Sequence, residues 1–173
     1  MGIVEIVLNP KSGGRAVERA HAVEAALRRR GIAARLRATG ARGDAEAMAR
    51  AAALAHGEGR CAALLVAGGD GTLAEAANGL AGSALPLGLV PAGTANVLAQ
   101  ELGWPREPDA IAAIVAGGRT MRAGLGLAGS RRFLLMAGIG LDAEVVASMP
   151  PALKRRLGQR AVAARDEERR AAS

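Results

Sequence analysis

Apolar runs of two different periods follow one another along most of the chain. Short β-rich runs, consecutive or alternating, predict strands at 3–9, 32–39, 61–68 and 85–93. Apolar residues spaced three or four positions apart predict a helix after residue 14 and further helices at 44–56, 72–80, 94–103 and 107–118. This order of elements implies parallel strands joined by right-handed crossovers. The predicted fold class is therefore α/β, with a layered parallel sheet.

The helix after residue 14 has one mostly apolar face. Its members are spaced at helical intervals: Val17, Ala20, Val23, Glu24 and Leu27. Three arginines at 28–30 and then Gly31 follow this face. Basic residues suit the negative end of a helix dipole and glycine suits a C-cap, so we expect the helix to end there.

The pattern changes after residue 118. Two β-like runs surround the turn AGS with no helix between them, which indicates that a different architecture begins. We expect three parts: an α/β domain at 1–118, the start of a β-rich second domain at 119–148, and a basic tail, helical or disordered, at 149–173.

A glycine-rich loop follows the most apolar strand, where residues 64–80 read LLVAGGDGTLAEAANGL. Helix N-termini at the carboxyl ends of parallel strands favour anions, and Gly68, Gly69 and Gly71 let the backbone approach one closely. Asp70 would repel phosphate by itself, which favours a role in binding hydrated Mg²⁺, or in positioning a hydroxyl or basic group, beside the phosphates. The later AGTAN sequence also follows a strand and starts a helix. Two such anion sites suit a triphosphate.

Thr72 and Glu75 also fit a simpler structural explanation. Thr72-Leu73-Ala74-Glu75 matches the capping box, in which the two side chains satisfy the start of a helix. We expect this cap to form. It leaves the three glycines and Asp70 unexplained, although a tight strand-to-helix turn could use them.

Composition restricts the classes of partner. Half of the 173 residues are hydrophobic, which is enough to bury a sizeable core, and only 1% are aromatic. Because proteins that bind single-stranded nucleic acid stack the bases on aromatic side chains, which are scarce here, we expect no nucleic-acid partner. The single cysteine, Cys61, lies in an apolar run and is interpreted as a packing residue.

Charge and hydropathy indicate where the protein acts. The net charge is +7, and the segment 150–173 carries seven basic and three acidic residues. This segment could touch anionic lipid, or it could be a solvated helix face. The N-terminus lacks a signal-type block and no apolar stretch approaches the roughly 18 residues of a membrane span. We expect a cytoplasmic protein, with peripheral contact at the inner face of the membrane.

Three motifs together resemble one protein family. NPKSGG at 9–14, GGDGTLAEAANGL at 68–80 and PAGTANVLAQELG at 91–103 are similar to the nucleotide-site motifs of the diacylglycerol kinase catalytic domain family. This family includes bacterial lipid kinases and is related to sphingosine and ceramide kinases. GARGDA at 40–45 and RRFLLMAGIGLDAEVV at 131–146 extend the resemblance. GGDGT alone is shared with NAD kinases and phosphofructokinases.

The resemblance implies a fold, ligands and site residues. The fold would be the nucleotide-binding domain of NAD kinases and diacylglycerol kinases, followed by the first strands of a β-sandwich. ATP and Mg²⁺ would be the cofactors and a lipid hydroxyl at the membrane surface the acceptor. The implied ATP-binding residues are Asn9, Thr39, Gly68, Gly69, Asp70, Gly71, Thr72, Glu75 and Thr94. Asp70 would also be the metal ligand and the catalytic residue, and Asp142 would lie near the acceptor.

Structural alternatives remain open for several of these residues. Asn9 and Ser12 also fit a β-turn with a helix cap. Asn78 and Asn96 also fit ordinary polar positions on a helix surface. Asp142, in GIGLDA, also fits a turn.

The sequence departs from the family in two respects. Gly124 occupies a position where the family commonly has an aspartate that supports the metal, and relatives place a general-base glutamate in a second domain that residue 173 does not reach. We expect a nucleotide-binding half with a truncated β-sandwich. Residues 131–147 could then pack back on the first domain, pair with another chain, as in a homodimer, or be poorly ordered.

Three functions are compatible with these features. The leading one is an ATP-dependent lipid kinase that transfers the γ-phosphate to a hydroxyl, present as its nucleotide-binding half. The second is an NAD kinase-like enzyme, although the expected Asn-Glu pair for the adenosine ribose is not found. The third is a catalytically inactive nucleotide-binding or interaction module, which the truncation and Gly124 favour.

Overall fold

Four parallel strands form the central sheet of the protein. The computed structural model describes residues 2–13 and 15–134. The spatial order is β2-β1-β3-β4, and the strands are β1 (Ile3–Leu8), β2 (Ala34–Ala38), β3 (Cys61–Gly68) and β4 (Leu87–Pro91). All three neighbouring pairs are parallel. The predicted parallel α/β sheet is confirmed.

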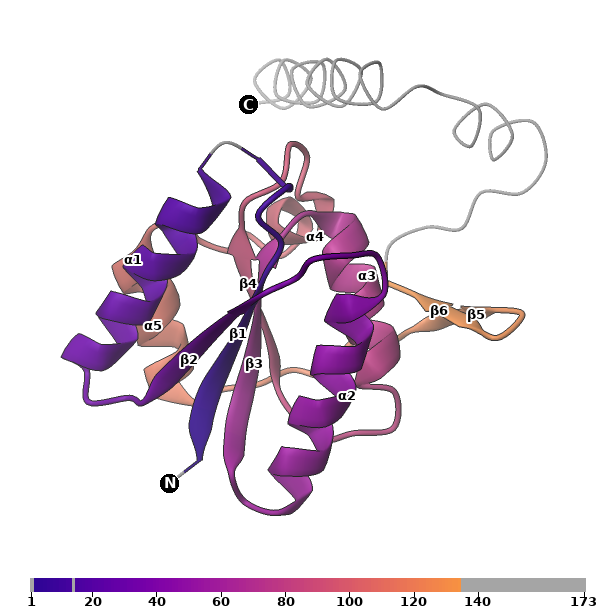
Figure 1. The fold of residues 1–173 in the computed structure, drawn as a ribbon, viewed down its shortest axis with the longest axis horizontal. Helices are drawn as coiled ribbons and strands as arrows, with labels where there is room; N and C mark the ends of the chain where they lie inside the picture. Colours follow the sequence, from indigo (N-terminus) through magenta and orange to yellow (C-terminus); the bar gives the residue numbers. More distant parts are fainter. Residues whose placement is uncertain (1, 14, 135–173) are drawn as a thin grey trace. The chain divides into compact units, whose positions relative to one another are not determined.

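Helices cover both faces of this sheet (Figure 1). One face carries α1 (Ala16–Arg29) and α5 (Pro108–Gly117), and the other carries α2 (Asp44–Gly57) and α3 (Asp70–Gly79). The short α4 (Val97–Glu101) follows β4. The sheet is therefore the middle of three layers.

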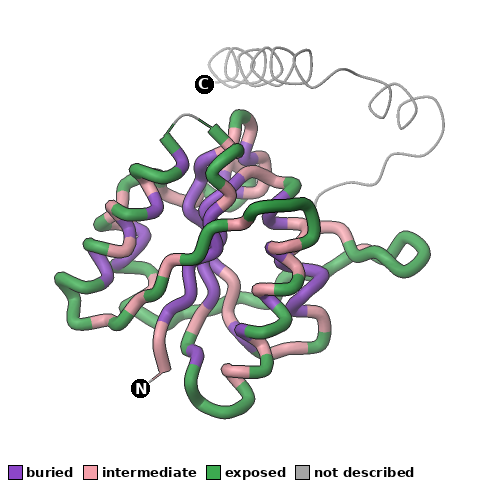
Figure 2. The backbone as a smooth tube through the Cα atoms, viewed as in Figure 1, coloured by how far each residue is buried: buried purple, intermediate pink, exposed green. Residues whose placement is uncertain are grey.

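The core forms because side chains alternate across the sheet. In β1, Val4, Ile6 and Leu8 pack with α1 and α5, while Val7 packs with α2 and α3. Figure 2 shows the buried backbone concentrated in the strands and along the inner sides of the helices. Cys61 is buried in the part of the core that lies between the sheet and helices α2 and α3, which confirms its role in packing.

The prediction of which residues form the buried face of α1 was partly wrong. Val17 is 44% exposed, whereas Ala16 and Ala26 are fully buried beside Val23. Small alanine side chains let α1 approach the sheet closely, so the buried stripe runs through them. This rotates Val17 to the solvent side.

The predicted capping box was also wrong. Helix α3 begins at Asp70 rather than at 72, and its N-cap, Gly69, makes no side-chain cap bond. Thr72 lies inside the helix, where its Oγ1 accepts a hydrogen bond from Asn9 at 2.9 Å. Glu75 Oε2 accepts from the Gly43 N–H at 3.0 Å. Both side chains bind neighbouring loops instead of their own helix terminus.

The predicted helix at 94–103 is much shorter in the structure. Helix α4 has five residues, because Asn96 adopts a left-handed conformation with φ 48° and ψ 53° immediately before it. Asn96 is only 5% exposed. It is therefore not an ordinary polar residue on a helix surface.

A short antiparallel hairpin follows α5. It consists of β5 (Gly126–Ala128) and β6 (Arg131–Phe133), which confirms two β-like runs around AGS. Asn78 of α3 holds it: Oδ1 accepts from the Arg132 N–H at 2.9 Å, and Nδ2 donates to the Arg132 carbonyl at 2.8 Å. Asn78 is buried by this contact rather than lying on a solvated surface.

The domain boundaries at 118 and 148 stay predictions. Asp142 and the basic tail at 149–173 lie outside the described residues. In the part of the chain that the structure does describe, no helix combines the length and hydrophobicity needed to cross a bilayer.

Candidate functional site

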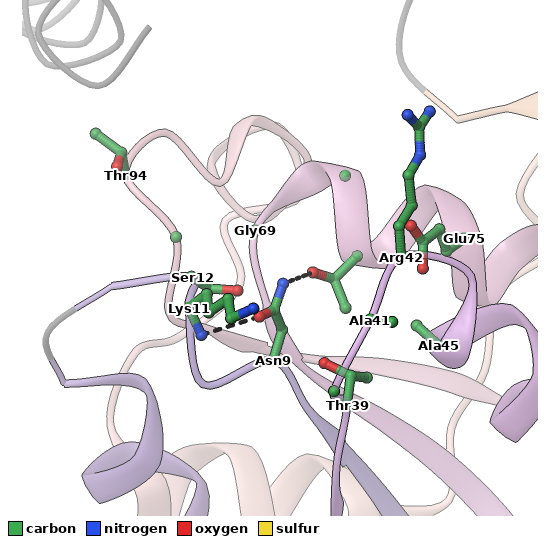
Figure 3. Close-up of a pocket in the computed structure, with 14 residues that line it drawn as sticks. Asn9, Lys11, Ser12, Thr39, Ala41, Arg42, Ala45, Gly69, Glu75 and Thr94 are labelled. Atoms are coloured by element: carbon green, nitrogen blue, oxygen red, sulfur yellow. Dashed lines mark hydrogen bonds between the residues drawn. The ribbon is translucent and has the colours of Figure 1, made fainter. Parts of the chain in front are cut away.

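The carboxyl ends of the four strands meet at one edge of the sheet, and a pocket of about 440 Å³ lies there. Its walls come from the loops that follow β1, β2, β3 and β4, together with the first turn of α2 and the first two turns of α3 (Figure 3). The lining residues are Asn9, Lys11, Ser12, Thr39, Gly40, Ala41, Arg42, Ala45, Gly69, Gly71, Thr72, Glu75, Gly93 and Thr94. Residues far apart in sequence thus share one cavity.

Asn9, at the end of β1, joins two of these loops. Its Oδ1 accepts the Lys11 N–H at 2.9 Å, which forms an Asx-type turn within the first loop. Its Nδ2 donates to Thr72 Oγ1 at 2.9 Å. The turn alternative that the sequence allowed for Asn9 is therefore present, and the same side chain also binds α3.

The second loop is held by Asp44, the first residue of α2. Its Oδ2 accepts the N–H groups of Gly40 and Ala41, each at 2.8 Å. These hydrogen bonds, from Ala41 first and then Gly40, hold the pKa of Asp44 below its ordinary value. Thr39 precedes this loop, and its N–H donates to the Leu8 carbonyl at 2.8 Å. The wall at 39–41 is therefore fixed at both ends.

Gly68 and Gly71 of GGDGT are glycine for different structural reasons. A Cβ on Gly68 would lie 2.8 Å from the Cβ of Thr72, so Gly68 leaves room for that side chain. A Cβ on Gly71 would meet nothing within 4 Å. Gly71 faces the pocket, where a small residue permits close approach of a ligand.

Asp70 does not line this pocket. Its Oδ2 accepts the Val97 N–H at 3.1 Å and its Oδ1 accepts the Leu98 N–H at 3.3 Å, so the carboxylate caps α4. The start of α4 is therefore already occupied by a carboxylate. A second anion site at the AGTAN loop stays a prediction, and the N–H groups of Val97 and Leu98 are not free to form it.

The loop after β4 lies directly against the GGDGT loop. The Gly68 carbonyl accepts the N–H groups of both Ala92 and Gly93, each at 3.2 Å. A Cβ on Gly93 would lie 2.5 Å from the Cα of Gly69. Glycine at 93 is required because the two backbones touch.

The first loop also packs on the loop after β4. A Cβ on Gly13 would lie 2.5 Å from the Ala92 carbonyl oxygen. Arg19 of α1 donates from Nη1 to the Pro91 carbonyl at 2.6 Å. The NPKSGG, GGDGT and PAGTAN segments consequently form one connected set of turns.

Two cations and one acid give the pocket its charge. Lys11 and Arg42 both contribute to its lining, and so does Glu75. Ser12 Oγ, also in the lining, is buried without a hydrogen-bond partner among the described residues. A buried hydroxyl of this kind calls for an explanation, and a bound ligand would provide one.

Seven of the nine residues predicted to bind ATP line the pocket: Asn9, Thr39, Gly69, Gly71, Thr72, Glu75 and Thr94. Gly68 and Asp70 do not; they border a smaller space that adjoins it at Gly69. Sequence reasoning missed Lys11 and Arg42. Their signal was their position inside the NPKSGG and GARGDA motifs.

The described residues contain no cluster of three or more His, Cys, Asp or Glu side chains that could hold a metal ion. Asp70 and Glu75 are the acids that border the two spaces at this edge. Mg²⁺ is commonly bound by one or two carboxylates together with substrate phosphates. The donor set therefore fits a Mg²⁺ ion that enters with a nucleotide.

Fold and pocket define a parallel α/β domain with a glycine-rich, cationic pocket at the carboxyl edge of its sheet. Residues 4–128 match the family model of the diacylglycerol kinase catalytic domain. The chain belongs to this family.

Relatives and solved structures agree with this assignment. The chain is 42% identical over 128 residues to a diacylglycerol kinase of Mycobacterium tuberculosis (strain CDC 1551 / Oshkosh), covering 73% of this chain and 40% of that protein. It is 35% identical over 159 residues to a diacylglycerol kinase of Bacillus subtilis (strain 168), covering 89% of this chain and 51% of that protein. A crystal structure of a diacylglycerol kinase from Bacillus anthracis str. Sterne superposes with a TM-score of 0.64 at 26% identity, and the superposition covers 84% of this chain and 50% of that chain. The chain thus spans about half the length of these relatives.

Proposed function

We propose that this chain binds Mg-ATP in the pocket at the carboxyl edge of its sheet and supplies the nucleotide-binding half of an ATP-dependent lipid kinase. The observation that carries the proposal is the convergence of NPKSGG, GGDGT and PAGTAN on one pocket. Family membership favours a lipid acceptor, and it favours this reading over an NAD kinase.

The two sides of the pocket suit different parts of a nucleotide. Lys11, Gly69 and Gly71 combine a cation with backbone that a phosphate can approach closely, at the start of α3. The orphaned hydroxyl of Ser12 supplies a further donor. We place the polyphosphate here.

The wall from 39 to 45 is better suited to the nucleoside. Ala41 and Ala45 offer small apolar surfaces, and Thr39 and Glu75 offer polar groups beside them (Figure 3). Glu75 binds the Gly43 N–H through Oε2, which fixes its carboxylate near this wall. We place the base and ribose on this side, with Glu75 as a hydrogen-bond acceptor.

Asp70 remains our candidate metal-linked and catalytic residue. Each of its oxygens accepts one N–H from α4 and retains a lone pair. Through water, these lone pairs could bind Mg²⁺, which would neutralise phosphate charge during phosphoryl transfer. In such a reaction the protein mainly positions the nucleotide and stabilises charge.

The acceptor, the membrane contact and the assembly are proposals drawn from the family. A relative of Pseudomonas aeruginosa (strain UCBPP-PA14), 39% identical over 159 residues, is named "Probable lipid kinase YegS-like". We propose a lipid hydroxyl at a membrane surface as acceptor, reached by peripheral contact from the cytoplasmic side. A homodimer is one way to cover the edges of the hairpin.

Radiolabelled phosphate transfer tests the proposed reaction. The chain is incubated with γ-labelled Mg-ATP and either diacylglycerol in mixed micelles or NAD⁺. Label in the lipid supports the proposal, and label in NAD⁺ alone contradicts it. ATP binding with no transfer to either acceptor would mean that these residues bind the nucleotide but do not complete the kinase by themselves.

A further inference from the structure

Asn96 is a buried polar residue in a strained conformation. Its φ of 48° is the only positive φ of a non-glycine residue among the described residues. Left-handed backbone is unfavourable for most side chains, and asparagine is one of the few that tolerate it. Strained, buried polar residues often occur at functional sites.

Both polar atoms of this side chain bind a single residue, Gly93. Asn96 Oδ1 accepts the Gly93 N–H at 3.0 Å, and Asn96 Nδ2 donates to the Gly93 carbonyl at 2.6 Å. The carboxamide thereby closes the turn 93–96 from inside. Thr94 and Ala95 are held between the two ends of this clamp.

The clamped residue faces the pocket, whereas Asn96 does not. Gly93 and Thr94 line the pocket together with Gly69 and Gly71, while Asn96 borders the smaller adjoining space. The backbones of Gly93 and Gly69 touch, so a shift of the turn would change the shape of the pocket. Asn96 can therefore affect a ligand only through the turn.

Asp70 fixes the same turn from its other side. It binds the N–H groups of Val97 and Leu98, the two residues that follow Asn96. Those donors are occupied, and the Gly93 N–H is bound by Asn96 Oδ1 and the Gly68 carbonyl. A phosphate near this loop must therefore be bound by Thr94 rather than by Gly93 or the start of α4.

We infer that Asn96 is a positioning residue for the polyphosphate: by binding Gly93 at both polar atoms, it holds Thr94 in the arrangement that binds the phosphates, without touching them. This inference rests on the proposed binding of ATP. Loss of Asn96 should therefore weaken binding of the phosphates and not of the nucleoside, because the turn borders the side of the pocket that holds Lys11, Ser12 and Gly69.

Calorimetric titration of Asn96→Gly with Mg-ATP, Mg-ADP and adenosine tests the inference. Glycine adopts the left-handed conformation freely and removes only the clamp. Loss of two hydrogen bonds should weaken ATP and ADP binding by roughly ten-fold and leave adenosine binding unchanged. A merely structural role would weaken all three ligands alike.

Two further variants complete the test. Asn96→Asp keeps the left-handed preference and the acceptor for Gly93 N–H but loses the donor, so it should also weaken ATP selectively; it replaces the glycine variant if that one does not fold. Asn78→Ala is the matched control, since it removes another buried carboxamide that holds β6 and lies outside the pocket. Its ATP affinity should equal that of the wild type.

Three outcomes overturn the inference. Equal ATP affinity in Asn96→Gly and the wild type would remove Asn96 from any positioning role. Equal loss for ATP and adenosine would reduce its role to folding. A folded wild-type chain that binds no ATP would overturn the proposed function and this inference with it. Failure of the inference alone is recognised because the wild-type chain then still binds ATP.

Discussion

Asn9 and Thr72, 63 positions apart, are joined by a hydrogen bond of 2.9 Å from Nδ2 to Oγ1. Asn9 also binds the Lys11 N–H, so one side chain fixes the turn of the first loop and ties it to α3. Both loops line the same pocket. The side chain of Asn9 therefore determines how the NPKSGG and GGDGT motifs face each other.

Replacement of Asn9 by alanine removes both of these bonds. The loss of two partly exposed hydrogen bonds should lower the free energy of unfolding by about 1–2 kcal/mol and weaken ATP binding by about ten-fold. Chemical denaturation and calorimetry measure the two effects. Unchanged ATP affinity in a folded Asn9→Ala variant would show that the contact is structural only.

Gly71→Ala tests whether a ligand approaches the glycine loop closely. The added Cβ meets nothing within 4 Å and lies inside α3, so folding stability should be unchanged or slightly higher. The Cβ projects at the pocket wall, so we expect ATP affinity to fall at least about ten-fold, since close backbone approach is what glycine permits. Gly117→Ala, in open space at the end of α5, is the control and should bind ATP normally.

Lys11→Met removes a cation from the pocket. Charge-assisted hydrogen bonds to phosphate are about twice as strong as neutral ones, so we expect about a ten- to thirty-fold loss of ATP affinity. Adenosine affinity should not change. Arg37→Met loses the same charge from β2 outside the pocket lining and serves as the control. Equal losses in the two variants would mean that only net charge matters.

Asp44 predicts a pH dependence of stability. Hydrogen bonds from Ala41 and Gly40 lower its pKa in the folded protein below the ordinary 3.8. A depressed carboxyl pKa stabilises the folded state above the unfolded pKa, and that contribution is lost as pH falls through the folded pKa. The stability difference between wild type and Asp44→Asn should therefore be constant above about pH 5 and shrink at lower pH. Denaturant titrations across this range measure it, and a difference that grows on acidification would contradict it.

Much of the fold was predictable because it depends on local periodicity and on glycine placement. The strand at 61–68 has its predicted bounds, and the helix expected at 44–56 extends to 57. These segments have strong apolar patterns that tertiary contacts reinforce rather than override. Val17 was misplaced because alanine, with its small side chain, gives a weak signal for the buried face.

The site was predictable at the level of motifs but not of side-chain direction. Glycine loops at strand ends indicated where a pocket forms, since parallel strands bring their carboxyl ends to one edge. The partner of Asp70 could not be inferred, because its carboxylate binds α4, a helix whose start depends on the left-handed Asn96. Thr72 and Glu75 matched a local cap, yet longer-range partners, Asn9 and Gly43, compete successfully for them.

Calorimetric titration of the wild-type chain with Mg-ATP tests the central claim most directly. The account predicts one site with a Kd below about 1 mM, the upper end of common KM values. When Mg-ATP is present at about 100 times this Kd, the free energy of unfolding should rise by about 2.7 kcal/mol, as measured by thermal or chemical unfolding. No heat of binding and no gain in stability at millimolar Mg-ATP, with the chain shown to be folded, would contradict the assignment of this pocket to ATP.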